Sequence, residues 1–195
     1  MLLTGARGTG KSTLVKAMVS RFGEKGLRLV QMERTQLDHL PRLLSLLGQE
    51  KHYRFVLFLD DLSFDEGEQE YKILKSAIDG SVTSQPENVL LYVTSNRRHL
   101  IKETLSDRSG DDIHEADTRQ ELMSLSARFG LTVTFQRPDK VRFEEILLDL
   151  AKQYGVQMPS DQLFIKGEAF AIRAGGRSPR VARQFIELLS AGVRL

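Results

Sequence analysis

The stretch "LLTGARGTGKSTLVKA", residues 2–17, decides the fold of this chain. Gly5, Gly10, Lys11 and Ser12 within it fit the pattern G-x-x-x-x-G-K-[ST]. A short apolar run precedes the pattern, and a segment of helical period, residues 12–22, follows it. Because a strand before and a helix after make this pattern credible, the stretch predicts a phosphate-binding loop at a strand-to-helix turn.

The residue types of this loop suit a nucleotide. Glycines let backbone N–H groups converge on phosphate oxygens, and the helix beginning near Ser12 adds the positive end of its dipole. The Lys11 ammonium would reach the β- and γ-phosphates, and the Ser12 hydroxyl would ligate Mg²⁺. A glycine-rich turn that matches the pattern by chance is the alternative. The predicted nucleotide-binding residues are Gly5, Ala6, Arg7, Gly8, Thr9, Gly10, Lys11, Ser12 and Thr13.

A second motif, "FVLFLDDL" at residues 55–62, is an apolar strand that ends in two adjacent carboxylates. Such acids are wanted beside the phosphates, so we expect Asp60 to bind Mg²⁺ together with Ser12 and Asp61 to activate the attacking water. An acidic turn without a catalytic role is the alternative. No N-K-x-D sequence for guanine occurs in the chain, which favours adenine. The predicted ligands are therefore ATP and Mg²⁺.

The rest of the chain alternates between strand-like and helical patterns as far as residue 137. Apolar runs at residues 27–31, 89–95 and 131–135 are separated by segments of helical period. Strands buried on both faces and joined by helices form parallel sheets, so we expect an α/β fold. From Pro138 onward only helical patterns remain. The sequence therefore predicts an α/β nucleotide-binding core over residues 1–137 and a helical part over residues 138–195.

Composition excludes several classes of protein. The chain of 195 residues has no cysteine and four scattered histidines, which disfavours a metal site built from those side chains. The longest apolar runs, "FVLFL" and "VLLYV", are too short to cross a membrane, so we expect a soluble, cytoplasmic protein. A net charge of +2 does not support nucleic acid as a partner. The polar segment 106–119 and the pair Arg97 and Arg98 are predicted to lie in solvated loops.

Three further stretches resemble the AAA+ ATPases when they are taken with the two motifs above. They are "YVTSN" at residues 92–96, "SLSARFG" at 124–130 and "GGRSPRVARQF" at 175–185. The resemblance implies that Asn96 is the sensor 1 residue, Arg128 the arginine finger and Arg180 the sensor 2 arginine. The residues alone allow other readings: Asn96 as the cap of a turn, Arg128 as a helix-end charge, and Arg180 as part of a solvated face with Arg177 and Arg183.

More closely, the chain is similar from end to end to an uncharacterised bacterial AAA+ family catalogued as domain of unknown function 815. The resemblance rests on the phosphate-loop stretch, "LDDLSFDEGEQEYKILKSAIDG", "VTSNRRHLI", "LSARFGL" and "GGRSPRVARQF". It implies a five-stranded parallel sheet in the order 5-1-4-3-2 and a helical lid from residue 138. It also implies a homo-oligomer in which one subunit completes the site of the next.

The chain departs from this pattern in two places. Asp61 stands where most AAA+ enzymes carry Glu, and its shorter side chain predicts slower turnover. The first strand begins with Met1, whereas the family carries a preceding portion and AAA+ domains generally hold adenine there. We therefore expect an N-terminally truncated chain, adenine contacts that lie before residue 1, and a frayed first strand.

These inferences predict an ATPase that binds Mg-ATP, hydrolyses it slowly in an oligomer, and remodels or switches an unknown protein partner. One alternative is a small P-loop kinase that passes the γ-phosphate to a metabolite. A second is an ATP-binding switch or adaptor that does not hydrolyse its nucleotide, which the aspartate at position 61 and the incomplete adenine pocket suggest.

Overall fold

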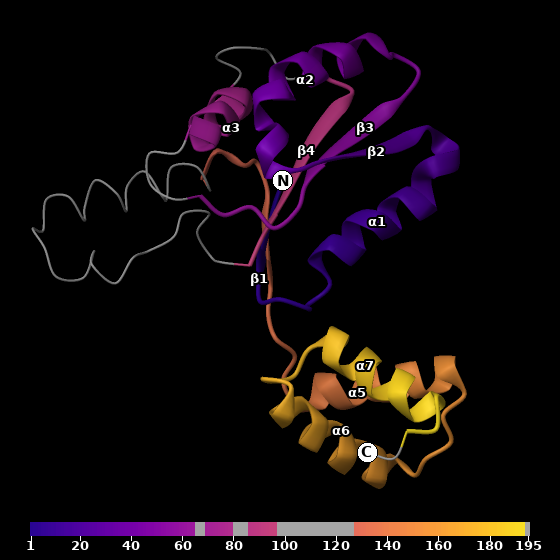
Figure 1. The fold of residues 1–195 in the computed structure, drawn as a ribbon. Helices are drawn as coiled ribbons and strands as arrows, with labels where there is room; N and C mark the ends of the chain where they lie inside the picture. The colour runs from indigo at the N-terminus through magenta and orange to yellow at the C-terminus, as the bar shows by residue number, and fades with distance from the viewer. Residues whose placement is uncertain (65–68, 80–85, 97–126, 194–195) are drawn as a thin grey trace, which may run out of the picture. The chain divides into compact units, whose positions relative to one another are not determined.

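The computed structural model describes residues 1–64, 69–79, 86–96 and 127–193 (Figure 1). Arg97, Arg98 and the predicted acidic loop 106–119 lie outside these residues. The chain divides into a core unit, Met1–Thr4 with Lys11–Thr134, and a C-terminal unit, Gly5–Gly10 with Phe135–Leu195. The predicted phosphate-binding loop therefore groups with the C-terminal helices, although α1 follows it directly in the chain.

The core unit is built on a five-stranded sheet in the order β2-β3-β4-β1-β5. This order confirms the prediction, as does the parallel pairing of β1 with β4, β2 with β3 and β3 with β4. Alternation of strand and helix requires such crossovers, because parallel neighbours cannot be joined by a tight turn. The strands are β1 (Leu2–Gly5), β2 (Leu27–Met32), β3 (Arg54–Leu59), β4 (Val89–Ser95) and β5 (Thr132–Phe135).

The prediction that the first strand is frayed is wrong. Leu2 and Leu3 are fully buried, and Leu2 lies in register with Val93 of β4. On the other side of β1, the Leu2 N–H donates to the Leu131 carbonyl at 2.8 Å. A strand between two neighbours has both edges hydrogen-bonded, so even a short β1 is held firmly.

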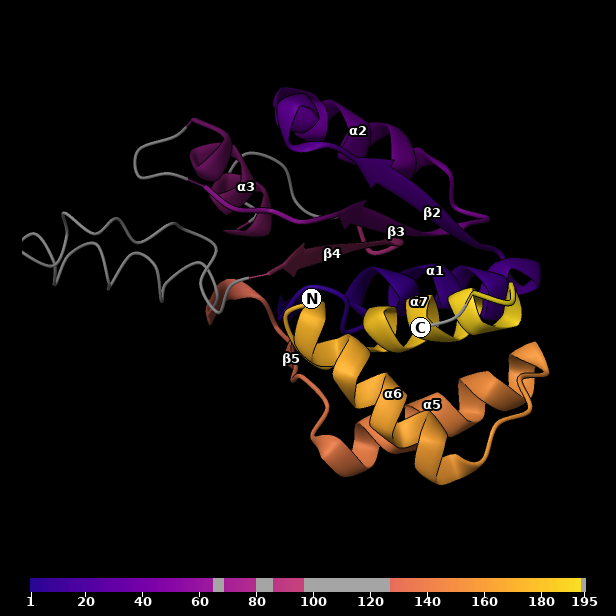
Figure 2. The ribbon, with the colours of Figure 1, turned by 60° about the horizontal axis from the view of Figure 1, so that its bottom comes forward.

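Helices cover both faces of the sheet in the core unit. Figure 2 shows α2 and α3 on one face and α1 on the other. Leu40, Leu44 and Leu47 of α2 recur at helical spacing and are buried in the main hydrophobic cluster. The helical elements are α1 (Lys11–Phe22), η1 (Gly23–Lys25), η2 (Arg34–His39), α2 (Leu40–Gln49) and α3 (Gln69–Asp79).

The C-terminal unit contains three helices, α5 (Lys140–Tyr154), α6 (Ser160–Arg173) and α7 (Pro179–Ser190). Side chains cap two of them: Asp139 accepts the Arg142 N–H at 2.8 Å, and Ser178 accepts the Val181 N–H at 3.2 Å. This unit has a hydrophobic cluster of its own, which includes Phe143, Leu147, Phe185 and Ile186. Among the described residues, no helix has the length and apolar character that a membrane span requires.

Candidate nucleotide-binding site

Glycines shape the loop that follows β1. Gly5, Gly8 and Gly10 have φ angles of 130°, 77° and 104°, a region that L side chains rarely adopt. A Cβ atom at Gly5 would lie 2.0 Å from the Phe135 carbonyl oxygen. The Thr9 hydroxyl closes the loop by donating to the Ala6 carbonyl at 2.8 Å. The glycines therefore allow a tight loop whose backbone is not covered by side chains at these three positions.

Lys11 and Ser12 begin α1, and each contacts a predicted site residue from another strand of the core unit. Lys11 is only 6% exposed, and its ammonium donates to Asn96 Oδ1 at 3.0 Å. The Ser12 hydroxyl donates to Asp60 Oδ1 at 2.7 Å. Thus the helix that the sequence places after the loop meets the carboxyl ends of β3 and β4.

The two adjacent carboxylates differ in surroundings. Asp60 directly follows β3 and accepts two hydroxyl donors, Ser12 and Thr94, on the same oxygen, Oδ1. Asp61 has a φ angle of 54°, the left-handed conformation that Asp tolerates better than most residues. Its N–H donates to Thr94 Oγ1 at 2.8 Å, and its Oδ1 accepts a hydrogen bond from Asn96 Nδ2.

Asn96 therefore bridges a cation and an anion. An amide side chain both accepts and donates, which allows it to accept from the Lys11 ammonium while it donates to the Asp61 carboxylate. The alternative that Asn96 merely caps the turn after β4 does not account for these two contacts. The structure thus brings Lys11, Asn96 and Asp61 into one hydrogen-bonded chain.

The pair formed by Ser12 and Asp60 fits a magnesium ion. A hydroxyl and a carboxylate are hard oxygen ligands, which Mg²⁺ uses together with phosphate oxygens and water. Among the described residues, no group of three or more His, Cys, Asp and Glu side chains is placed to hold a metal. Mg²⁺ does not need three protein carboxylates or histidines, because nucleotide phosphates and water molecules supply the other ligands.

Within the C-terminal unit, Arg180 lies beside the glycine loop. Its backbone N–H donates to the Gly8 carbonyl at 3.2 Å. A Cβ atom at Gly8 would lie 3.0 Å from the Arg180 Cβ and 3.1 Å from the Ser178 Oγ, so a side chain there would be tightly packed as well as strained by its φ angle. The Arg180 side chain is exposed, and its backbone lies next to the predicted phosphate-binding loop.

Arg177 does not share a purely solvated face with Arg180 and Arg183. Its guanidinium makes two hydrogen bonds to Glu168 of α6, at 2.9 and 2.6 Å. This contact lowers the pKa of the Glu168 carboxyl and raises the pKa of Arg177. The ion pair of Arg177 therefore links the segment before α7 to α6. Arg180 and Arg183, by contrast, are exposed.

Arg128 lies apart from the chain of Lys11, Asn96 and Asp61. Its guanidinium forms an ion pair with Asp79, the last residue of α3, and its side chain is 35% exposed. The next residue, Phe129, is buried in the hydrophobic cluster of the core unit and anchors the segment. Arg128 is thus an accessible cation on a fixed backbone, as a helix-end charge or a residue that acts on another subunit would be.

Sequence reasoning missed one residue of this cluster, Thr94. Its side chain is buried, at 1% exposure, and its hydroxyl contacts both Asp60 and Asp61. The available signal was a hydroxyl residue at the end of the apolar strand "VLLYVTS", two residues before Asn96. Position alone could not reveal it, because threonine is also an ordinary strand residue.

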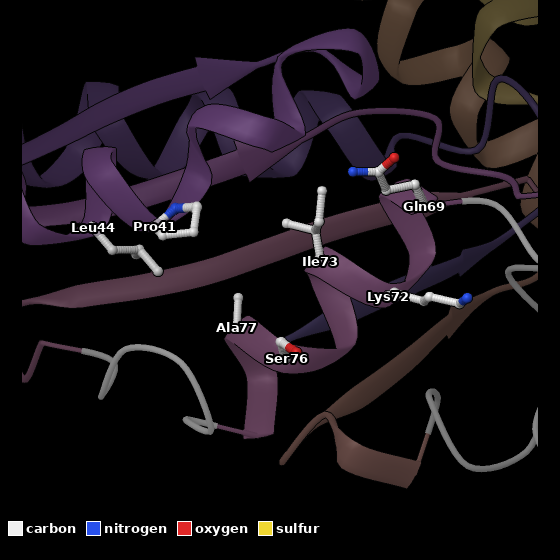
Figure 3. A pocket seen from close by; sticks show the side chains of 7 residues that line it. All are labelled: Pro41, Leu44, Gln69, Lys72, Ile73, Ser76 and Ala77. Atoms are coloured by element: carbon white, nitrogen blue, oxygen red, sulfur yellow. The ribbon is translucent and has the colours of Figure 1, made fainter.

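A separate apolar cavity of about 210 Å³ lies between α2 and α3 in the core unit (Figure 3). Pro41 and Leu44 line it from α2, and Lys72, Ile73 and Ala77 line it from α3. None of the predicted nucleotide-site residues is among its lining side chains. This cavity is therefore distinct from the polar cluster at the ends of β3 and β4.

Comparisons with known proteins show the family and the fold of this chain. The family described as "Protein of unknown function (DUF815)" matches residues 1–193. The RuvB Holliday junction branch migration motor of Thermotoga maritima is similar in structure, with a TM-score of 0.56, 18% identity, and coverage of 98% of this chain and 56% of that chain. No curated protein is significantly similar in sequence.

Two other solved structures share the fold. They are the FIGL-1 AAA domain in complex with ADP (TM-score 0.54, 18% identity, 98% of this chain and 60% of that chain) and the replication initiator DnaA bound to AMPPCP and single-stranded DNA (TM-score 0.57, 16% identity, 97% and 54%). The chain spans between half and two thirds of the length of these relatives. Identities this low show the fold alone, which is that of AAA+ ATPase domains.

Proposed function

This chain belongs to the family described as "Protein of unknown function (DUF815)", and on that premise we propose that it is an AAA+ ATPase that binds Mg-ATP and hydrolyses it slowly. One observation carries the proposal: two hydrogen-bonded groups, Lys11–Asn96–Asp61 and Ser12–Asp60, are joined into one cluster by Thr94. A glycine loop that matched its pattern by chance would not bring these chemical groups together.

Each group has a distinct task in this proposal. The backbone of residues 5–13 holds the phosphates, and the Lys11 ammonium binds the β- and γ-phosphate oxygens. Ser12 and Asp60 hold Mg²⁺, which neutralises charge on the phosphates. Asp61 accepts a proton from the attacking water, and Asn96 fixes the position of the Asp61 carboxylate. Release of Lys11 from Asn96 toward phosphate exchanges a hydrogen bond to a neutral amide for one to an anionic oxygen.

The slow rate follows from the side chain at position 61. Aspartate is one methylene shorter than the glutamate of most AAA+ enzymes, and a small displacement of a catalytic group lowers the rate considerably. Asn96 also occupies one hydrogen-bonding position on the Asp61 carboxylate, which leaves fewer positions for water. Both effects reduce water activation without weakening the binding of phosphate.

The proposal extends to an oligomer. Arg128 is accessible, and it would act on ATP held by a neighbouring subunit, where a guanidinium stabilises charge that develops in the transition state. Arg180, beside Gly8 in the C-terminal unit, would act on the nucleotide from a helical lid formed by residues 138–195. We propose a cytoplasmic homo-oligomer that remodels or switches a protein partner.

The proposed function is tested on Lys11. Lys11→Ala removes the ammonium that is proposed to bind the β- and γ-phosphates. We therefore expect nucleotide affinity or turnover to fall by at least about tenfold. Lys16→Ala, an exposed lysine of the same helix, is the matched control and should retain both. The measurements are titration with a fluorescent ATP analogue and phosphate release without an added acceptor. Equal affinity and turnover in Lys11→Ala and Lys16→Ala would contradict the assignment.

A non-hydrolysing switch is the second candidate function. The observation in its favour is the hydrogen bond from Asn96 to the Asp61 carboxylate, which lowers the capacity of that carboxylate to accept a hydrogen bond from water. Tight Mg-dependent binding of ATP with no phosphate release in the parent chain would favour the switch over the ATPase. A kinase, by contrast, would release little phosphate alone and transfer it when a metabolite is added.

A further inference from the structure

Thr94 is a buried polar residue near the end of β4, a strand whose earlier residues are mostly apolar. Its side chain is 1% exposed, and a hydroxyl at such a site destabilises the fold unless its hydrogen bonds are made. The hydroxyl uses both of its capacities: it donates to Asp60 Oδ1 at 2.6 Å and accepts the Asp61 N–H at 2.8 Å. One side chain of β4 therefore contacts both carboxylate residues that follow β3.

The backbone of Thr94 adds a third contact to the same turn. Its carbonyl accepts the Leu62 N–H at 2.8 Å. The pairing of Leu59 with Val93 brings the end of β3 beside Thr94, so the sheet register sets these contacts. They surround Asp61, whose left-handed backbone, φ 54°, persists only where neighbouring groups support it.

We propose that Thr94 is a positioning residue that holds Asp60 and Asp61 in the conformation used for Mg-ATP; this inference rests on the proposed function. Ser12 and Thr94 both donate to Asp60 Oδ1. A hydroxyl can bind a metal ion through an oxygen lone pair and still donate its proton, so Ser12 can serve both the metal and Asp60, and Thr94 is a second, buried donor that orients this carboxylate. The Thr94 contact to the Asp61 N–H fixes the direction from which the Asp61 side chain reaches Asn96.

The test removes the hydroxyl while keeping the shape of the side chain. Thr94→Val should raise the Mg²⁺ concentration needed for half-maximal ATP binding by about tenfold, because loss of an outer-shell partner typically costs about 10–100-fold in metal affinity. The kcat should fall as well, whereas ATP affinity without Mg²⁺ should stay at the parental value. Thr94→Ser keeps the donor and acceptor and should restore both quantities to within about threefold.

A structural readout accompanies these measurements. In the nucleotide-free protein, hydrogen exchange at the Asp61 amide should accelerate in Thr94→Val and remain slow in Thr94→Ser, because only serine replaces the acceptor. Thr134→Val is the matched control, since it removes a different hydrogen bond between sheet threonines, the 3.1 Å contact with Thr4. It should leave Mg²⁺ dependence and Asp61 exchange unchanged. If Thr94→Val does not fold, Thr94→Ala removes the same hydroxyl and takes its place.

The outcomes separate the two proposals. An active parent whose Thr94→Val and Thr94→Ala variants keep parental Mg²⁺ dependence and kcat would overturn the positioning role and leave the proposed function intact. Equal losses in Thr94→Val, Thr94→Ser and Thr134→Val would also overturn it, because they would indicate general damage to the sheet. A parent chain without Mg-dependent ATP binding would overturn the proposed function and, with it, this inference.

Discussion

At the scale of single residues, two adjacent aspartates have different chemical surroundings. The Asp60 carboxylate accepts hydrogen bonds from two hydroxyl groups. The Asp61 carboxylate accepts one from the Asn96 amide, and the Asp61 backbone N–H donates to Thr94. The residues themselves were predictable from "FVLFLDDL", because an apolar strand that ends in acids is a recognisable pattern. The left-handed backbone of Asp61 and the contact from Thr94 were not predictable, since both depend on a strand more than thirty residues away in the chain.

The difference between the aspartates predicts opposite defects. Asp60→Asn should remove most of the Mg²⁺ stimulation of ATP binding, because an amide is a poorer ligand for a hard cation. Asp61→Asn should bind Mg-ATP with parental affinity and lose about 10²-fold or more in kcat, since an amide cannot take a proton from water. Parallel titrations of ATP binding and phosphate release measure the two effects.

The exposed Asp38 of η2 supplies the control for the aspartate variants, because Asp38→Asn makes the same chemical change outside the cluster. It should retain parental binding and turnover. Parental turnover in Asp61→Asn would remove Asp61 from the role of water-activating acid. A loss of nucleotide binding in that variant would assign Asp61 to binding instead.

At the scale of elements, the segment before α7 is tied down at several points within the C-terminal unit. The Arg137 guanidinium donates to the Gly175 carbonyl at 3.1 Å, and Arg177 pairs with Glu168 of α6. Gly176 has a φ angle of 125°, which favours glycine, and a Cβ atom there would displace the end of the Arg137 side chain, 2.6 Å away at Nη1. These contacts fix the start of α7, whose Arg180 N–H holds the Gly8 carbonyl.

The helices of this unit were largely predictable from their caps, but the tie to the glycine loop was not. Ser178 before Pro179 predicts the start of α7, because both residues favour a helix N-terminus. The contact of Gly8 with Arg180 joins residues that are far apart in the chain, and the local pattern around each gives no sign of the other. The fraying of β1 was mispredicted for the same reason, since the hydrogen bonds that hold this short strand come from residues near β4 and β5.

The ion pair of Glu168 and Arg177 predicts a pH dependence of stability. Hydrogen bonding from Arg177 lowers the pKa of Glu168 in the folded state below its ordinary value of about 4.3. A carboxyl with a lowered pKa contributes stability above its unfolded pKa, and the contribution is lost as pH falls through the folded value. Glu168→Gln should therefore lower the thermal midpoint slightly from pH 8 to about pH 5, and the difference should shrink below about pH 4.

Thermal unfolding followed by circular dichroism across this pH range measures the effect of the ion pair. Glu145→Gln is the control, because its partner Arg142 is more exposed and water screens that pair more strongly. Its midpoint should differ little from the parental value at any pH. A Glu168→Gln difference that grew as pH fell would have the wrong sign for this ion pair.

At the scale of the whole molecule, the AAA+ fold was predictable because its motifs occur in a fixed order along the chain. The strand order came from the resemblance to a family rather than from any single strand, since short apolar runs do not encode their neighbours. The sequence also could not show which units group together: residues 5–10 belong by contact to the C-terminal unit, although they lie beside β1 in the chain. Assembly belongs to this scale too, and Arg128 is the residue through which it can be tested.

Arg128→Ala should bind ATP with parental affinity and lose most of its turnover, because an arginine finger supplied by another subunit is worth on the order of 10³ or more in rate in P-loop enzymes. Its only described ion pair, with Asp79, is partly exposed and contributes little to folding. Arg142→Ala, which breaks an exposed ion pair in α5, is the matched control and should keep parental turnover.

A mixing experiment decides whether Arg128 acts across subunits. Lys11→Ala and Arg128→Ala are each expected to be inactive, but a mixed oligomer pairs some intact phosphate sites with intact arginines. Phosphate release should therefore recover in part when the two variants are combined at concentrations where oligomers form, and it should depend on total protein concentration. Mixed oligomers that remain inactive would contradict action in trans. Full turnover of Arg128→Ala alone would leave this arginine as a surface charge whose only described partner is Asp79.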